Sequence, residues 1–277
     1  MKKLPILMLI GAMALSQSCF RMRWPDHKAY ASFERQGVPL QIMDTLIEGH
    51  SIHFAVSSSS DLPVLVFIHG SPGSWFHYRK FMLDPDLGKK FQIVSIDRPG
   101  FGYSDFGKAM HLEDQARVIT PVLKSLKSAK PMFLCGHSMG GPVVVKLAAD
   151  NPDLFKTIVI VAGAIDVTQE KKECWRHLMG KTAFRWMLPG AFRPSNTELL
   201  YLKKDLIPLK ADFKNIQCDV LFVHGDKDTW VPMENVAFGK KMMDNAKSIQ
   251  VDTLHSADHQ VPWKRFQDLK RILMQLE

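Results

Sequence analysis

The segment Gly136-His137-Ser138-Met139-Gly140 holds residue types that could do covalent chemistry. It directly follows the apolar run Pro131–Cys135 and directly precedes a helical pattern that begins at Gly140. A strand that turns this sharply into a helix exposes the central side chain, and it requires small residues on both sides of that side chain. The free amides of the helix N-terminus then point toward the reaction centre. The pattern therefore predicts that Ser138 is the nucleophile of an acyl-transfer reaction.

The elements that must position this turn alternate between short apolar β-branched runs and longer helical patterns. Near-continuous apolar strands are typical of a parallel sheet that is buried on both faces. The strands are expected at Val64–Ile68, Phe91–Ile96, Pro131–Cys135, Thr157–Val161, Val220–Val223 and Ser248–Thr253, and the helices at His111–Ser128, Gly140–Asn151, Asn235–Asn245 and Trp263–Leu276. We predict an α/β fold with a doubly wound, mostly parallel sheet. An antiparallel hairpin, with strands at Val38–Leu46 and Ser51–Val56, is expected at its edge.

One stretch, from about residue 167 to 209, breaks this alternation because it contains no run that reads as a buried strand. Aromatic residues are interspersed there with basic ones, and we predict a small helical cap inserted between two strands. The aromatics suit either an apolar acyl pocket or the core of the cap, and the sequence does not separate these two roles. Arg176, Arg185 and Arg193 would favour an anionic substrate if they faced the site.

Four further segments follow expected strands or precede the last expected helix. They are His69–Gly73, Asp97–Ser104, His224–Pro232 and Ala257–Trp263. Together with the glycine-serine turn, and in this order, they make the chain resemble the α/β-hydrolase family from about residue 38 to the C-terminus. In that family the four segments are the oxyanion loop, a conserved turn, the loop of the catalytic acid and the loop of the catalytic histidine.

The resemblance implies a role for each matching residue. His259 would take the proton of Ser138 and return it to the leaving group. Asp228 would hold the imidazole in the productive tautomer. The backbone amides of Ser71 and Met139 would form the oxyanion hole. The chain order serine, aspartate, histidine is the order expected for this fold.

Several neighbours compete for these roles. Asp226 lies in the same loop as Asp228, and we interpret it as a brace of the turn. Asp166 follows an earlier strand and is an alternative position for the acid. His255 is interpreted as a loop residue, His137 as a packing residue and His69 as a structural hydrogen-bonding residue. Arg98 is expected to form a structural ion pair.

Serine at the turn separates this chain from relatives that carry aspartate there, the haloalkane dehalogenases and epoxide hydrolases, although His69–Pro72 resembles their oxyanion loop. Serine implies an acyl-enzyme, and hydrolysis of a small-molecule carboxylic ester is the expected reaction. The same segments occur in lipases, C–C bond hydrolases and proline aminopeptidases, which remain alternatives. A non-catalytic binding protein of this fold is a further alternative, but it predicts the loss of a triad residue, and all three residues are present.

Composition limits the partners. The formal charge is +8, but the basic residues are scattered, so no nucleic-acid partner is expected. The four cysteines lack the spacing of a metal site, and no phosphate-binding glycine pattern follows a strand. We expect no metal and no cofactor.

The N-terminus reads as a separate module. Residues 1–19 show a charged start, a short apolar run and small residues before Cys19, which is the layout of a lipoprotein-like signal peptide. Ser16 stands where such a signal prefers an aliphatic residue. Residues 20–37 are expected to be a tether, and residues 38–277 the hydrolase domain. The prediction is an exported protein at the periplasmic or outer face of the envelope, anchored to the membrane by a lipid on Cys19.

Overall fold

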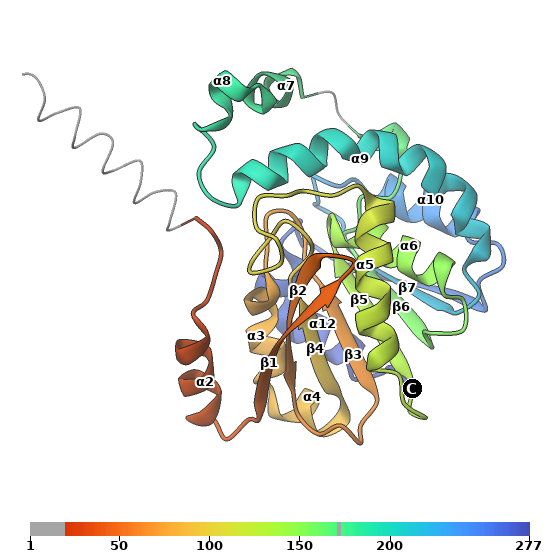
Figure 1. Cartoon of the computed structure of the whole chain (residues 1–277). Coiled ribbons are helices and arrows are strands. Elements are labelled where there is room, and N and C mark those ends of the chain that lie inside the picture. Colours follow the sequence, from red (N-terminus) through yellow and green to blue (C-terminus); the bar gives the residue numbers. More distant parts are fainter. Residues whose placement is uncertain (1–19, 171–172) are drawn as a thin grey trace, which may run out of the picture.

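The computed structural model describes residues 20–170 and 173–277, and an eight-stranded sheet runs through its centre (Figure 1). The strand order is β1-β2-β4-β3-β5-β6-β7-β8. The strands are β1 (Leu40–Ile47), β2 (His50–Ser57), β3 (Val64–Ile68), β4 (Gln92–Ile96), β5 (Met132–His137), β6 (Thr157–Val161), β7 (Asp219–Gly225) and β8 (Ser248–Leu254). Strands β1 and β2 are antiparallel to their neighbours, and all other pairs are parallel. The predicted fold class is confirmed.

Two layers of helices cover the sheet, because its central strands are apolar on both faces. Every residue of β3, β5 and β6 is buried. One apolar core lies under α5 (Leu112–Ser125), α6 (Gly140–Asp150), α9 (Phe192–Asp212) and α10 (Glu234–Met242). The other lies under α2 (Asp26–Glu34), the 3-10 helix η1 (Trp75–Tyr78), α3 (Arg79–Met82), α4 (Pro85–Lys90), α11 (Val261–Lys264) and α12 (Phe266–Leu273).

The antiparallel hairpin forms where the sequence predicts it, but the C-terminal helix is interrupted. Glu48 and Gly49, which join β1 to β2, have φ values of 51° and 82°, as a two-residue hairpin turn requires. The last helix was expected to be continuous from Trp263 to Leu276. It is instead divided into α11 and α12, because Arg265 has non-helical backbone angles (φ −116°, ψ 37°).

The segment between β6 and β7 is helical. It contains η2 (Val167–Gln169), α7 (Cys174–Gly180), α8 (Thr182–Arg185), α9 and η3 (Phe213–Asn215). Helix α9 lies across the carboxyl end of the sheet, and α7 and α8 lie beyond it, away from the strands (Figure 1). Leu202, Leu206 and Leu209 are buried on α9, so this helix belongs to the core on one side.

Residues 20–37, which were expected to be a tether, pack against the domain. Helix α2 buries Ala29 and Phe33 completely. The Trp24 ring lies 5.8 Å from the Trp75 ring, centroid to centroid. These contacts fix the direction from which the chain enters the domain.

Candidate active site

Ser138 occupies the turn between β5 and α6 with a φ of +55°, which non-glycine residues rarely adopt. Two backbone hydrogen bonds hold the turn. The Ser138 N–H donates to the Val161 carbonyl (3.0 Å), and the Gly141 N–H donates to the Ser138 carbonyl (2.9 Å). Backbone strain of this kind persists only where the surroundings fix the conformation, and it concentrates at functional sites.

The glycines beside Ser138 are required by close backbone contacts. A Cβ on Gly136 would lie 2.4 Å from the Gly140 carbonyl oxygen, and a Cβ on Gly140 would lie 2.3 Å from the Ile68 carbonyl oxygen. Both distances are far below a van der Waals contact, and the obstructing atoms are backbone. The turn therefore brings α6 against the end of β3, which carries the predicted oxyanion loop.

The three residues predicted as a triad come together at this turn. His259 Nε2 lies 2.9 Å from Ser138 Oγ, and His259 Nδ1 lies 2.7 Å from Asp228 Oδ2. An ionised carboxylate only accepts hydrogen bonds, so Nδ1 carries the proton and Nε2 presents its lone pair to the Ser138 hydroxyl. The hydrogen-bond chain thus has the polarity that proton removal from serine requires.

Asp228 is kept ionised by its partners. Its Oδ1 accepts hydrogen bonds from the amides of Trp230 and Val231, both at 2.9 Å. Burial acts to raise the pKa of the Asp228 carboxyl, but the hydrogen bond from His259 and these two amides outweigh it, so the pKa lies below its usual value. His224 Nε2 donates to the Val231 carbonyl (2.9 Å) and holds the loop in place.

The amides predicted as the oxyanion hole flank the Ser138 turn. Ser71 lies in the loop after β3, and Met139 follows Ser138 directly and precedes α6. Within residues 20–170 and 173–277, neither N–H donates a hydrogen bond to the protein. The Ser71 hydroxyl donates to Ser195 Oγ on α9 (2.8 Å), so the loop is tied to the helical segment above it.

His137, interpreted from the sequence as a packing residue, has a more specific contact. Its Nε2 donates to the backbone carbonyl of His259 (2.9 Å), which anchors the loop of that histidine to the end of β5. Burial, reinforced by the nearby His259, lowers the pKa of His137 to about 3, so the ring is neutral. No local sequence signal identifies this contact, because the two residues lie 122 positions apart.

Arg98 forms the predicted ion pair, with a partner that the sequence did not identify. Its guanidinium makes a two-pronged contact with Glu198 of α9, at 2.7 and 3.0 Å, and both side chains are fully buried. The same group donates to the carbonyls of His69 (2.7 Å) and Gly70 (3.0 Å). The pair therefore connects α9 to the oxyanion loop.

The competing acids and histidines lie outside the hydrogen-bond chain. Asp226 accepts from the Ser256 amide (2.7 Å) and lies 3.2 Å from His255 Nδ1, so it braces the turn as interpreted. Asp166 accepts from the amide and hydroxyl of Thr168. His69 Nε2 accepts from the Arg98 amide (2.9 Å), as expected of a structural histidine.

Two exposed tryptophans stand beside the triad. The Trp230 ring lies 5.2 Å from the His259 ring, and the Trp263 ring lies 5.2 Å from the His137 ring. Trp230 is 69% exposed and Trp263 is 44% exposed. Such rings offer an apolar surface to a substrate that approaches His259.

In the described part of the chain, no group of three or more His, Cys, Asp or Glu side chains could hold a metal ion. Within the same residues, no helix combines the length and the apolar character needed to cross a membrane. Cys19 and the predicted signal peptide lie outside the described residues.

Comparison with known proteins agrees with the fold described above. Residues 63–187 match the model of the alpha/beta hydrolase fold family. A putative lipase from Acinetobacter baumannii superimposes with a TM-score of 0.68 at 17% identity, over 91% of this chain and 96% of that one. The chain has the α/β-hydrolase fold.

Two curated relatives are similar in sequence. The uncharacterized hydrolase YugF of Bacillus subtilis is 24% identical over 260 residues, which cover 79% of this chain and 91% of that protein. The soluble epoxide hydrolase of Corynebacterium sp. is 33% identical over 118 residues, 42% of this chain, and the match spans only 39% of that protein. Together, these similarities support a hydrolase of the α/β-hydrolase fold.

Proposed function

We propose that the protein is a serine hydrolase that cleaves a small-molecule carboxylic ester through an acyl-enzyme. The observation that carries the proposal is the unbroken hydrogen-bond chain from Ser138 through His259 to Asp228. Each of the three side chains stands on a different loop at the carboxyl end of the sheet. Their convergence there is what nucleophilic catalysis in this fold requires.

In the proposed reaction His259 Nε2 takes the hydroxyl proton as Ser138 Oγ attacks the ester carbonyl carbon. Asp228 stabilises the imidazolium that forms. The carbonyl oxygen becomes an oxyanion, which in this proposal accepts hydrogen bonds from the amides of Ser71 and Met139. His259 then gives its proton to the leaving alcohol as the C–O bond breaks. Water repeats the sequence on the acyl-enzyme and releases the acid.

Serine at the turn also decides between reaction classes. The epoxide hydrolase relatives resemble this chain over less than half of their length, and members of that class carry aspartate where Ser138 stands. Opening of an epoxide is therefore not proposed. A peptidase of this fold would need acidic cap residues to hold an amine, but in residues 167–209 eight Lys or Arg residues outnumber four Asp or Glu residues, which counts against a peptidase.

The proposal is tested with p-nitrophenyl esters of increasing acyl length. Wild-type protein is expected to turn over at least one ester, and Ser138→Ala is expected to lower kcat by roughly 10,000-fold or more while the circular dichroism spectrum is unchanged. Retention of full activity by the folded variant would end the assignment of Ser138.

We also propose export and lipid anchoring at Cys19, which rest on the sequence of residues 1–19 alone. Cys19→Ala should prevent lipidation. The variant is then expected to lack the mass of a diacylglyceryl group and to leave the membrane fraction at high salt. If Cys19→Ala lacks the lipid but still stays in the membrane fraction, the acyl group is not the anchor.

A further inference from the structure

The outer part of the helical segment exposes an unusual amount of apolar surface. Helix α7, helix α8, the loop to α9 and the first residue of α9 carry large apolar side chains that are 38–52% exposed, and Phe20 beside them is 44% exposed. The exposed residues in this group are Phe20, Trp175, Leu178, Phe184, Trp186, Met187 and Phe192. Large apolar side chains that are exposed together on neighbouring helices are typical of an interaction surface.

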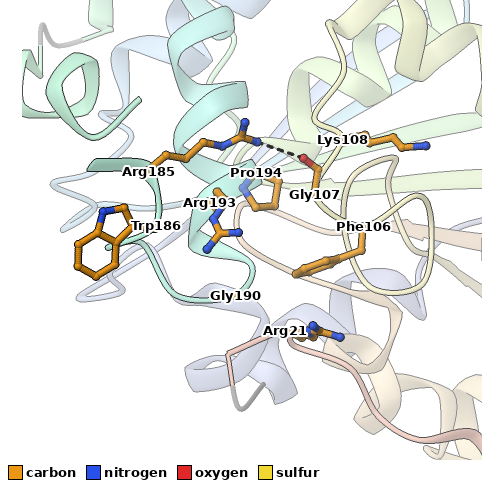
Figure 2. Close-up of a pocket in the computed structure, with 9 residues that line it drawn as sticks. All are labelled: Arg21, Phe106, Gly107, Lys108, Arg185, Trp186, Gly190, Arg193 and Pro194. Carbon is orange, nitrogen blue, oxygen red and sulfur yellow. Dashed lines mark hydrogen bonds between the residues drawn. The ribbon is translucent and has the colours of Figure 1, made fainter. Parts of the chain in front are cut away.

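Cations border the same surface. Residues 173–194 contain four Lys or Arg residues and one acidic residue, Glu173, which pairs with Arg176. A pocket of about 560 Å³ lies between this segment and the loop at residues 106–108, and four cationic side chains line it. They are Arg21, Lys108, Arg185 and Arg193, and Figure 2 shows that they come from three separate segments.

The contacts of two of these cations do not neutralise their charge. Arg185 donates to the Gly107 carbonyl (3.5 Å), and the Arg21 guanidinium carbon lies 5.7 Å from the centre of the Phe106 ring. Neither contact supplies a negative charge. Among the described residues that line the pocket, none is acidic.

The chain also enters the described structure at this surface. The Ala191 N–H donates to the Phe20 carbonyl (2.7 Å), and the Phe20 and Phe192 rings lie 6.0 Å apart, edge to face. In the sequence, Phe20 follows the N-terminal apolar run, which ends at Leu15, by five positions.

We propose that α7, α8 and the pocket residues form a docking face for a bilayer that contains anionic lipid. Aromatic side chains favour the interface between acyl chains and headgroups, and Lys and Arg beside them bind anionic headgroups. A second copy of this chain is a poorer occupant, because the face would place its own positive charges against each other. Docking does not depend on the proposed catalysis.

The orientation has a consequence for the candidate active site. Ser195, next to the pocket residue Pro194, accepts a hydrogen bond from Ser71 of the oxyanion loop. A membrane seated on α7 and α8 would lie beyond α9, and only this helix would separate it from the loop of the candidate site (Figure 1). Docking would bring the site near esters that partition into lipid.

The first test measures partition of the full chain onto sedimented vesicles of two compositions. One contains phosphatidylcholine alone, and the other contains phosphatidylcholine with roughly 30% phosphatidylglycerol. The triple variant Arg21→Ser, Lys108→Ser and Arg185→Ser is expected to lose the preference for anionic vesicles by roughly 100-fold, at about fivefold per charge. The matched control removes three exposed lysines at the opposite end of the sheet, Lys124, Lys127 and Lys130, and should keep the preference. Ser138→Ala should also keep it, so failure of docking and failure of the proposed catalysis are distinguishable.

The second test locates the contact by quenching of tryptophan fluorescence with brominated lipid in the anionic vesicles. Most of the quenching should disappear in the double variant Trp175→Phe, Trp186→Phe. The quenching should persist in the double variant Trp230→Phe, Trp263→Phe, which lacks the two exposed tryptophans at the candidate site. Size-exclusion chromatography of the first pair shows whether the face joins two copies instead.

The proposal is overturned if the triple-charge variant keeps the wild-type lipid preference, or if the lysine control loses as much. It is also overturned if quenching is unchanged without Trp175 and Trp186. A change of oligomeric state with unchanged vesicle binding would assign the face to a second copy.

Discussion

The Ser138 turn and the outer helices α7 and α8 belong to one chain but follow different physical rules. Helix α6, which begins at the turn, buries nine of its eleven residues, whereas α7 buries none of its seven. A Cβ on Gly140 at the turn would meet backbone atoms, whereas a Cβ on Gly180 of α7 would meet only side-chain atoms. Catalysis requires atoms held at fixed positions, whereas the proposed lipid-docking face requires only exposed apolar and cationic side chains.

The largest expected effect concerns the acid of the hydrogen-bond chain. Asp228→Asn should lower kcat/KM for a p-nitrophenyl ester by about 10,000-fold, because an amide no longer holds the His259 tautomer that accepts the Ser138 proton. Asp226→Asn is the control from the same loop, and its effect should stay under about tenfold. Equal losses in the two variants would contradict the assignment of Asp228.

The next prediction concerns α9, which lies between the rigid core around Ser138 and the outer helices α7 and α8. Glu198→Gln leaves the buried Arg98 without its counter-ion and should lower the free energy of unfolding by about 3–5 kcal/mol in urea titrations. Glu173→Gln removes the surface pair with Arg176 on α7 and should cost under about 1 kcal/mol. A small effect at Glu198 would place α9 with the outer helices rather than with the core.

A pair of glycine substitutions compares the two regions directly. Gly140→Ala drives a methyl group into the Ile68 carbonyl and should cost about 1–3 kcal/mol of stability, with loss of esterase activity. Gly180→Ala on α7 meets the end of the Leu200 side chain at 3.1 Å and Asn196 Nδ2 at an ordinary contact of 3.8 Å, and alanine favours the helix. Its stability should be unchanged or slightly higher. Thermal unfolding of the two variants measures both changes in stability. If Gly140→Ala is as stable as the wild type, the turn is not rigid.

The smallest expected effect is in the outer helices. Trp186 is 52% exposed, so Trp186→Ala should change the free energy of unfolding by no more than about 0.5 kcal/mol. Turnover of a short, water-soluble ester should also be unchanged. A large loss of stability would mean that the outer helices have a core of their own.

The sheet was predictable because its signals are local. The apolar β-branched runs, the Glu48-Gly49 turn and the small residues around Ser138 each carry their own physical constraint. The break at Arg265 was missed because amphipathic spacing continues across it, and the packing of α2 was missed because a short polar helix shows little pattern.

The candidate site also contains residues that local sequence signals identify and contacts that they do not. Ser138 follows from a local motif, and the structure places Asp228 and His259 beside it as the resemblance implied. Glu198 as the partner of Arg98, and the bond from His137 to the His259 carbonyl, join residues 100 and 122 positions apart. Such contacts depend on tertiary packing, which no window of sequence contains.

The most direct test of the proposed nucleophile is covalent labelling with a fluorophosphonate, followed by mass spectrometry of the digested protein. We expect one adduct, on the peptide that contains Ser138, and its absence in Ser138→Ala and after acid denaturation. An adduct on a different serine, or none on folded wild-type protein, would contradict the proposal that this turn carries an activated nucleophile.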